Sequence, residues 1–478
     1  MIDARSLPPA RTYGIGLLLG GYAAVVAVTP VVGQVAFVAP VLAAPLVLWL
    51  LAGPARWLLA FLVCALVLPP LPFALGDTGP HICLVIVALG AFAGLLRIGE
   101  WRIRLEPVHL PILGYCSVLA ASVGFAAVYS GLSIAAASFA RVMLFCISIY
   151  IFFYTAYGPG SDRRAGEAQS LRSVYWAGAA GAVFACVDFY FQLPAPSGFG
   201  PQFVWLESGV YRRAQGVFYE ASTLGNLCTF FLVMIAVSLA RPRVQGAATF
   251  LSPGALLSGG VVFASALMLS FSRASVLNLF VSLIALVYLQ RRRIRLRRLI
   301  VLPLVALSVA AIGSHLLFPQ FTTFYWERMR ASVEFFFTAT EGILSGRLES
   351  WRILTQFLLD HPWHAVFGVG YKTLPYSDFV GQPVIADNAY LSALVETGII
   401  GLGAMLLLSG AVLRIAWKAA RQTNPRSAFF GGCVFCFWIG EMVQMLSGDL
   451  LTYWRVLPVY FWLLGMAARS SADERSSA

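Results

Sequence analysis

Runs of about 20 mostly apolar residues recur along almost the whole chain, and they constrain its fold more than any other feature. A helix of that length can cross the hydrocarbon core of a bilayer, because it satisfies its backbone hydrogen bonds internally. Only 11% of the 478 residues are charged, whereas a soluble domain carries about 25% because its surface faces water. The sequence therefore predicts an all-α polytopic membrane protein.

The apolar runs predict about 14 transmembrane helices, with 12 to 14 as the expected range. Their approximate limits are 13–30, 34–52, 57–72, 80–96, 107–128, 133–157, 174–192, 217–240, 255–271, 274–290, 299–317, 388–417, 427–446 and 451–468. The first run leads directly into the second without a small-residue cleavage site. We therefore expect it to be a membrane span and not a cleaved signal peptide.

The basic residues predict which side of the membrane each connection faces, since cytoplasmic loops carry an excess of Lys and Arg. With both termini in the cytoplasm, most of the 33 Lys and Arg residues fall on the cytoplasmic side, including the arginine block in 291–298. The net charge of +12 is thus explained by topology and by contact with anionic lipid. No nucleic-acid partner is expected.

Two of the predicted outside connections are long, at about 193–216 and 318–387. The larger one is expected to contain an amphipathic helix at 321–337 and a second helix at 346–360. Loops of this length are usually functional. The expected divisions are 1–192, the N-terminal transmembrane helices; 193–317, the central transmembrane region with the first outside arginine patch; 318–387, the large outside loop; and 388–478, the C-terminal transmembrane helices with a short cytoplasmic tail.

The chain lacks the sequence motifs of a soluble catalytic domain. No phosphate-binding P-loop, G-x-G-x-x-G dinucleotide motif, H-E-x-x-H zinc motif or G-x-S-x-G nucleophile motif is present. Any chemistry is therefore expected at the membrane surface, between helix ends and the large loop.

Four polar patches between 210 and 403 lie on the predicted outside. They are Arg212-Arg213-Ala-Gln-Gly-Val-Phe-Tyr-Glu220; Ser272-Arg273; Arg347-x-x-x-Trp351 with His361-Pro362 and Gly368-Val-Gly370; and Asp387-Asn388 followed, after nine residues, by Gly398-Ile-Ile-Gly401. In their order, spacing and sidedness, these patches together resemble the O-antigen ligase and Wzy-type polysaccharide polymerase superfamily.

The resemblance implies a GT-C-like membrane glycosyltransferase of the bacterial inner membrane, with its active site on the periplasmic face. Its donor would be an undecaprenyl-pyrophosphate-linked oligosaccharide, and it would need no metal or cofactor. A ligase passes the glycan to a lipid A core, whereas a polymerase passes the growing chain to the next lipid-linked repeat unit. Beyond donor, acceptor and membrane lipids, a chain-length regulator and a flippase are further partners implied by the resemblance.

The outside arginines suit this chemistry, because a departing pyrophosphate needs positive charge where negative charge develops. Arginine stays protonated and binds phosphate oxygens through two parallel hydrogen bonds. We predict catalytic roles for Arg213 and Arg273, and substrate binding by Arg347 and Arg212. The alternative is that an arginine at a helix end extends to lipid headgroups, and this applies most to Arg212.

Asp387 is a departure from the ligase pattern, which has a histidine at this position. Histidine titrates near neutral pH, so a carboxylate is the weaker base. Asp387 is predicted to be catalytic, either orienting the acceptor hydroxyl or acting as a base in a desolvated pocket; Glu220 is the other candidate base, and Asp387 could instead cap the following helix. The remaining predicted substrate-binding residues are Asn388, Tyr390, Trp351 and Lys372.

Other polar residues give weaker expectations. The helix after Asp387 should bend near Gly398, Gly401 and Gly403, and His361 or His364 could replace the missing base although both fit a turn. Polar side chains within spans should face the bundle interior. These are Arg141, Asp188, which could pair with an arginine; Glu396, which could support the site; and Glu441 with Gln444, which fit an interhelical hydrogen bond.

Three functions follow as hypotheses. The leading one is a repeat-unit polymerase for a surface or secreted polysaccharide, because aspartate replaces the ligase histidine. The second is an O-antigen ligase or a protein-glycosylating relative. The third is a polysaccharide transporter or flippase, although no internal repeat with a midplane site is evident.

Overall fold

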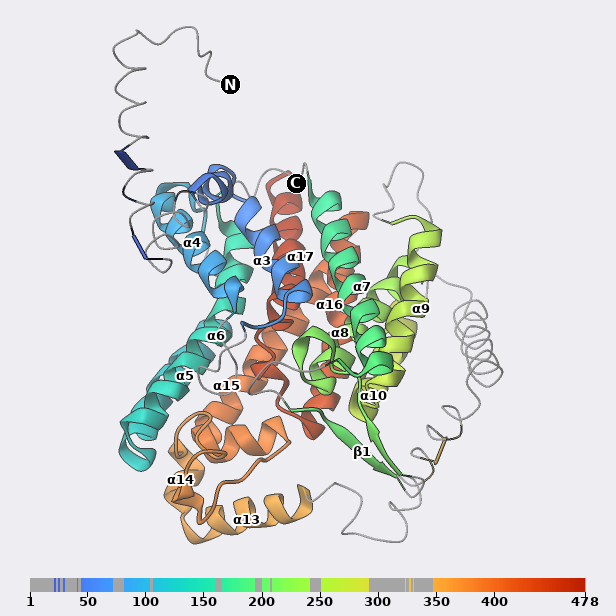
Figure 1. Ribbon diagram of the computed structural model, residues 1–478. Helices are drawn as coiled ribbons and strands as arrows, with labels where there is room; N and C mark the ends of the chain where they lie inside the picture. Colours follow the sequence, from blue (N-terminus) through green and yellow to red (C-terminus); the bar gives the residue numbers. More distant parts are fainter. Residues whose placement is uncertain are drawn as a thin grey trace, which may run out of the picture.

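The computed structural model describes mainly residues 44–71, 81–103, 106–159, 166–193, 200–206, 209–240, 251–291 and 347–477, with a few single positions outside these ranges. These residues form a bundle of long helices, with two short helices, α13 and α14, below one end (Figure 1). The predicted spans 13–30 and 299–317 and the predicted helix at 321–337 lie largely or wholly outside the described residues.

The first half of the bundle begins with a helix at Ala44–Ala52, which meets α3 at a bend of 117°. The helices that follow are α3 (Arg56–Val67), α4 (Ile82–Leu96), the 3-10 turn η2 (Ile98–Glu100), α5 (Leu110–Ser130), α6 (Leu132–Tyr157) and α7 (Glu167–Phe191).

A short antiparallel hairpin then joins β1 (Phe203–Leu206) to β2 (Gly209–Arg212), with Phe203 opposite Arg212. It is followed by η3 (Gly216–Phe218), α8 (Ala221–Ala240), α9 (Pro253–Leu269), α10 (Arg273–Gln290), α13 (Arg347–Asp360), α14 (Pro362–Phe367), η4 (Asp378–Val380), α15 (Ala389–Ala420), α16 (Pro425–Gln444), η5 (Met445–Ser447), η6 (Leu450–Thr452) and α17 (Leu457–Ser477).

Several helix starts are set by local sequence. Ser252 accepts a hydrogen bond from the amide of Ala255 at 3.2 Å, and Asn424 accepts one from the amide of Arg426 at 3.0 Å. In both cases a proline occupies the first helical position, where its missing amide proton costs nothing. Ser252 and Asn424 therefore fix where α9 and α16 begin, just before the apolar runs of these helices.

The helical prediction is confirmed for the described residues. Each predicted span from 57–72 to 274–290 and from 388–417 to 451–468 contains a helix, and the loop helix predicted at 346–360 is α13. Seven described helices are long and apolar enough to cross a membrane, or eight if the bent pair forms one span. The chain is therefore a polytopic helical membrane protein.

Two apolar cores hold this arrangement. The large one joins the bundle helices, with Trp57, Tyr175, Phe231, Trp438 and Tyr460 among its fully buried side chains. A small separate core lies within the large loop. It consists of Leu354, Phe357, Val369, Leu374, Val380, Val384, Ala386 and Val395, the last from α15. The loop is thus folded around its own interior and fixed to the bundle through α15.

The predicted bend in α15 occurs at Gly398, whose φ of 70° breaks the helix. The break leaves the carbonyls of Val395 and Glu396 to accept loop amides, from Val369 at 3.1 Å and Gly370 at 2.8 Å. A Cβ at Gly398 would lie 2.0 Å from the carbonyl oxygen of Val366. The backbones of the loop and the helix therefore meet closely at this point, and only glycine fits at position 398.

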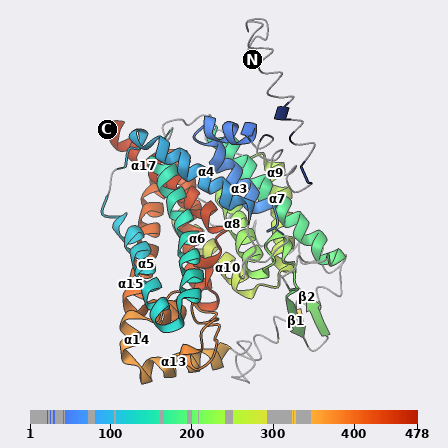
Figure 2. The same cartoon turned by 60° about the vertical axis from the view of Figure 1, so that its left-hand side comes forward.

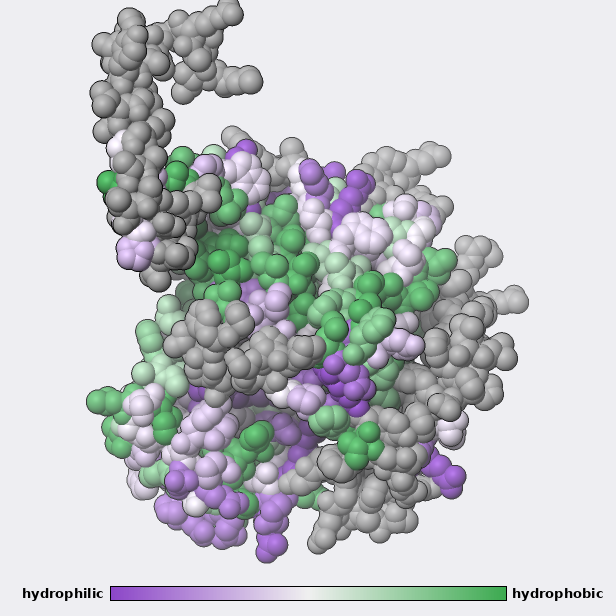
Figure 3. Space-filling model, in the orientation of Figure 1, coloured by the Kyte–Doolittle hydropathy of each residue, from purple (hydrophilic) through white to green (hydrophobic). Residues whose placement is uncertain are grey.

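The two ends of the bundle differ. The large loop with α13 and α14 covers one end, whereas α17 finishes at the other (Figures 1 and 2). In Figure 3, hydrophilic residues gather over α13 and α14, and hydrophobic surface covers much of the helices above them. Hydrophilic residues also lie at the top of the view in Figure 3, so both ends of the bundle are more polar than its middle.

Candidate functional site at the loop end of the bundle

The two adjacent arginines of the first patch serve different partners. Arg212 ends strand β2, and its Nη2 lies 3.2 Å from Oδ1 of Asp188 and 3.1 Å from the carbonyl oxygen of Leu193. Its side chain is 11% exposed, and that of Asp188 is 8% exposed. The expected pairing of Asp188 with an arginine is thus present. It gives Arg212 a structural partner at the end of α7.

Arg213 follows the strand and takes the opposite direction, as successive residues in a strand do. Its amide donates to the carbonyl of Gln202 at 2.8 Å, and its Nε donates to the carbonyl of Ser270 at 2.8 Å. Burial lowers its pKa, the nearby Arg273 and Arg347 lower it further, and Glu220 raises it. This electrostatic coupling shows that Arg213, Arg273 and Arg347 lie within range of one another.

The turn that carries Arg273 is a compact hydrogen-bonded unit. The amide of Ser272 donates to Oγ of Ser270 at 3.3 Å, and the hydroxyls of Ser272 and Ser275 lie 2.8 Å apart. Gln444 of α16 donates to Oγ of Ser275 at 3.0 Å. Arg273 begins α10 from this turn with an exposed side chain. Arg273 is therefore accessible from the surface, whereas Arg213 is half-buried.

Glu220 lies beside the arginines, immediately before α8. The hydroxyl of Thr223 donates to its Oε2 at 2.7 Å, and Tyr453 also forms a hydrogen bond to it. Burial raises the pKa of Glu220, and Asp387 contributes in the same direction, against the effect of Arg213. The two predicted bases are thus close enough to influence each other.

Asp387 meets Arg347 across the end of the loop. Nε of Arg347 lies 3.0 Å from Oδ2 of Asp387, and its Nη1 donates to Oγ of Ser447 at 2.6 Å. The Asp387 side chain is 45% exposed, so an ion pair and access to solvent coexist there. The predicted capping role of Asp387 is wrong. Asn388 is the N-cap, because its side chain accepts hydrogen bonds from the backbone amides of Tyr390 and Leu391.

The other predicted binding residues hold this end of the loop in place. Nε1 of Trp351 donates to the carbonyl of Ala386 at 2.7 Å, directly before Asp387. The hydroxyl of Tyr390 donates to the carbonyl of Met442 at 2.7 Å, which ties α15 to α16. With Asn388 used for capping, these three side chains position Asp387 through its neighbours.

Lys372 forms a second ion pair, with Asp449 between α16 and α17. Burial lowers the pKa of Lys372, but the carboxylates of Asp449 and Glu396 outweigh this and raise it overall. Lys372, Asp387, Glu396 and Asp449 line one cavity of about 60 Å³. Glu396 therefore lies near the candidate site, in the same cavity lining as Asp387.

Unusual backbone conformations gather at the same place. Five described non-glycine residues have positive φ: Gln192, Tyr219, Phe271, Lys372 and Asp387. Lys372 and Asp387 are themselves candidate site residues. Tyr219 directly precedes Glu220, and Phe271 lies two residues before Arg273. Such conformations cost about 1–3 kcal/mol each and cluster at functional positions.

The remaining polar candidates are structural. His361 and His364 stack on Phe357 within the loop, and their Nδ1 atoms face the carbonyls of Phe357 and Gly368. Arg141 faces the loop, against the carbonyl of Lys372 and the ring of Tyr376.

The predicted interhelical bond of Glu441 and Gln444 is present as a buried network. Nδ2 of Asn226 lies 2.6 Å from Oε2 of Glu441, and Nδ2 of Asn278 lies 2.8 Å from Oε1 of Gln444. Through Ser275, this network supports the turn that carries Arg273. It thus connects the bundle interior to the candidate site.

Sequence reasoning missed the contribution of the connection between α16 and α17. Ser447 and Asp449 bind the two loop cations, and Tyr453 contacts Glu220. The available signal was polar residues in an outside connection between two spans, but the connection is short and matches no patch of the resemblance.

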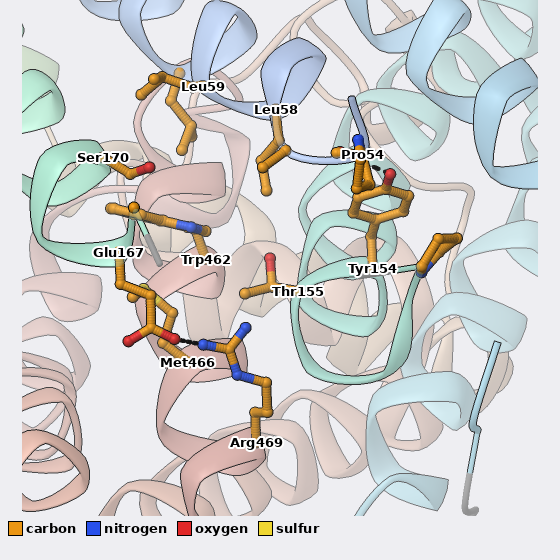
Figure 4. Close-up of a pocket in the computed structure, with 14 residues that line it drawn as sticks. Pro54, Leu58, Leu59, Tyr154, Thr155, Glu167, Ser170, Trp462, Met466 and Arg469 are labelled. Carbon is orange, nitrogen blue, oxygen red and sulfur yellow. Dashed lines mark hydrogen bonds and ion pairs between the residues drawn. The ribbon is translucent and has the colours of Figure 1, made fainter. Parts of the chain in front are cut away.

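A larger cavity of about 130 Å³ lies away from these residues, between α3, α6, α7 and α17 (Figure 4). Glu167 and Arg469, which form an ion pair, are part of its lining and lie below Trp462 in the view of Figure 4. None of the predicted site residues lines it. Among the described residues, no group of three or more His, Cys, Asp or Glu side chains is placed to hold a metal ion.

The helical bundle, with a cluster of charged residues at its loop end, defines a multi-pass membrane protein with a candidate site at one end of the bundle. Residues 258–406 match the family described as O-Antigen ligase. This confirms the resemblance to the O-antigen ligase and Wzy-type superfamily over that segment, which is less than a third of the chain. A search of the curated proteins found no match. The matched segment contains Arg273, Arg347, Lys372 and Asp387, whereas Arg213 and Glu220 precede it.

Proposed function

We propose that the protein is a membrane glycosyltransferase that polymerises undecaprenyl-pyrophosphate-linked repeat units of a surface or secreted polysaccharide. The observation that carries this proposal is the gathering of Arg213, Arg273 and Arg347 beside Asp387. The family match over residues 258–406 supports glycosyl transfer of the ligase or polymerase type. The arginines would stabilise the pyrophosphate as it leaves, and no metal ion would be required.

The proposal includes a membrane arrangement. The chain would cross the bacterial inner membrane fourteen times in a GT-C-like fold, with both termini in the cytoplasm and the large loop in the periplasm. The support is that α17 ends opposite the loop and that arginines are concentrated in the predicted cytoplasmic connections (Figure 2). The lipid-linked donor would then present its headgroup at the arginine cluster.

Each catalytic group has a defined task in this proposal. Arg213 and Arg273 would bind the pyrophosphate, Arg347 would connect it to Asp387, and Asp387 would orient the acceptor hydroxyl. The hydroxyl oxygen attacks the anomeric carbon, the bond to the pyrophosphate oxygen breaks, and the hydroxyl proton passes to a carboxylate. Glu220, with its pKa raised by burial, would be a stronger base than an ordinary glutamate and could receive that proton.

The test is complementation of a deletion strain, with glycan length as the readout. Arg213→Ala and Arg273→Ala should each lower polymer formation about 100- to 1,000-fold, the usual cost of removing one transition-state donor. Arg352→Ala is the matched control, because Arg352 is an exposed arginine on α13. Normal long-chain glycan in the Arg213 and Arg273 strains would refute the proposed site.

A ligase is the second candidate, and the description of the matching family favours it. The same deletion strain separates the two activities. Loss of a polymerase leaves single repeat units, whereas loss of a ligase leaves full-length chains on the lipid carrier.

A further inference from the structure

The cavity at Asp387 has the opposite electrostatic character from the arginine cluster. Its charged lining consists of three carboxylates, from Asp387, Glu396 and Asp449, and one ammonium group, from Lys372. That ammonium is already paired with Asp449. The nearby Arg141 is not part of the lining, because it faces the Lys372 carbonyl and Tyr376. Arg347 also pairs with Asp387 from outside the lining. The lining therefore has more carboxylates than cations, by a small margin.

The cavity has a mouth and a floor. Asp387 lies at the mouth with a 45% exposed side chain, whereas Glu396 is only 2% exposed and accepts a hydrogen bond from Ser392 at 3.0 Å. Leu374, Pro375, Val384, Ile385 and Ala386 supply the apolar part of the lining. A volume of about 60 Å³ accommodates a hydroxyl or hydroxymethyl group, since a water molecule occupies about 30 Å³ in the liquid.

Asp387 thus belongs to two environments. It pairs with Arg347, which lies within electrostatic range of Arg213 and Arg273, and its side chain also lines the acidic cavity. Glycosyl transfer needs two such environments, because its leaving group is an anionic pyrophosphate and its nucleophile is an uncharged hydroxyl. Carboxylates repel pyrophosphate but accept hydrogen bonds from sugar hydroxyls.

The geometry points to the cavity lined by Lys372, Asp387, Glu396 and Asp449 as the subsite for the acceptor sugar, selective for a neutral, hydroxyl-bearing edge over an acidic one. This inference rests on the proposed function and adds the place where the acceptor sugar binds. Asp449 and Glu396 hold the sugar hydroxyls, and Asp387 receives the attacking hydroxyl at the mouth. A carboxylate or phosphate substituent on the acceptor is excluded by charge.

The first experiment measures binding of inorganic pyrophosphate to the full-length protein in lipid nanodiscs. Arg213→Ala and Arg273→Ala should weaken binding at least tenfold. Asp449→Asn and Glu396→Gln should leave binding unchanged or tighten it two- to threefold, because each removes a nearby negative charge. Tenfold weaker pyrophosphate binding by either cavity variant would instead assign the cavity to the donor and overturn the inference.

The second experiment measures transfer, using lipid-linked glycan isolated from cells that lack this protein. Asp449→Asn and Glu396→Gln should raise the acceptor KM at least tenfold while donor cleavage by water continues. Gln356→Ala, an exposed change on α13, is the matched control, and Ser392→Ala tests the lining without altering charge. If the wild type neither cleaves nor transfers, the proposed function fails; if it transfers and the variants keep its acceptor KM, only the acceptor subsite fails.

The selectivity is tested by competition in the same transfer assay. Methyl β-glucoside should inhibit transfer at least fivefold better than methyl β-glucuronide, which has the same ring with a carboxylate. In Asp449→Asn and Glu396→Gln this preference should shrink, because the repelling charge is gone. Equal inhibition of the wild type by both glycosides would refute the charge selectivity.

Discussion

At the scale of single residues, neighbours in sequence have separate functions. Arg212 binds the buried Asp188, whereas Arg213 turns toward Ser270 and the other arginines. Asp387 and Asn388 divide tasks in the same way, since Asn388 caps α15 and thereby leaves the Asp387 carboxylate for Arg347 and the cavity. In each pair one side chain builds the scaffold and the other belongs to the candidate site.

Glu220 should show a trade-off between stability and activity. Because burial raises its pKa in the folded state, the folded protein binds the proton more tightly than the unfolded chain. The resulting stabilisation is complete below the usual glutamate pKa of about 4.3 and is lost as the pH rises through the raised value. Glu220→Gln should therefore raise the Tm at pH 8 and lower transfer, with little Tm difference at pH 4.

Melting curves of both proteins between pH 4 and 8 measure this effect. A Glu220→Gln variant that is less stable than the wild type at pH 8 would contradict a dominant role of burial. Thr223→Ser keeps the hydroxyl that donates to Glu220 and is a control for local packing.

Arg212 should be needed for folding more than for chemistry. Arg212→Ala leaves Asp188 as an unpaired buried charge, which typically costs about 3–5 kcal/mol. We expect a lower yield and Tm, with transfer per folded molecule within about threefold of the wild type. Combining Arg212→Met with Asp188→Leu should recover much of the Tm. A fully stable but inactive Arg212→Ala protein would instead assign Arg212 to the substrate.

At the scale of elements, the break in α15 positions the loop. Gly398→Ala should destabilise the protein by several kcal/mol, because the new Cβ would lie 2.0 Å from a backbone oxygen at a φ of 70°. Gly403→Ala is the matched control in the same helix, since no atom lies within 4 Å of its Cβ position. That change should be neutral or stabilising by about 1 kcal/mol. Equal Tm values for both variants would contradict a required break.

The elements were more predictable from sequence than the site. Apolar runs of membrane length specify helices because the bilayer leaves the backbone no other partner, so the described spans and α13 lie where expected. The arginines and Asp387 were predicted through family patches. Asp449, Ser447 and Tyr453 were not, because pairing between a loop and a distant helix connection leaves no local pattern. The side-chain roles of Asn388 and Arg212 likewise depend on partners that only the fold supplies.

At the scale of the whole molecule, the charge distribution predicts sidedness. A cysteine introduced at Gln356 on α13 should react with a membrane-impermeant maleimide in spheroplasts. One introduced at Arg421, after α15, should react only after permeabilisation. Both positions are exposed, and the eight natural cysteines are buried or half-buried, so background labelling should be low. The reverse pattern would place the active site in the cytoplasm.

The junction between α15 and the loop has a consequence for diversification. Val395 and Glu396 accept main-chain amides of Val369 and Gly370, so this part of the attachment does not depend on loop side chains. The Val395 side chain in the loop core and the ion pair of Lys372 with Asp449 add side-chain contacts to it. A descendant can therefore exchange other loop residues and retain the same anchorage, provided that the glycines at the junction and these contacts remain. Loops from relatives that keep them should be transplantable at this joint, and such exchanges would test whether the loop determines which glycan is used.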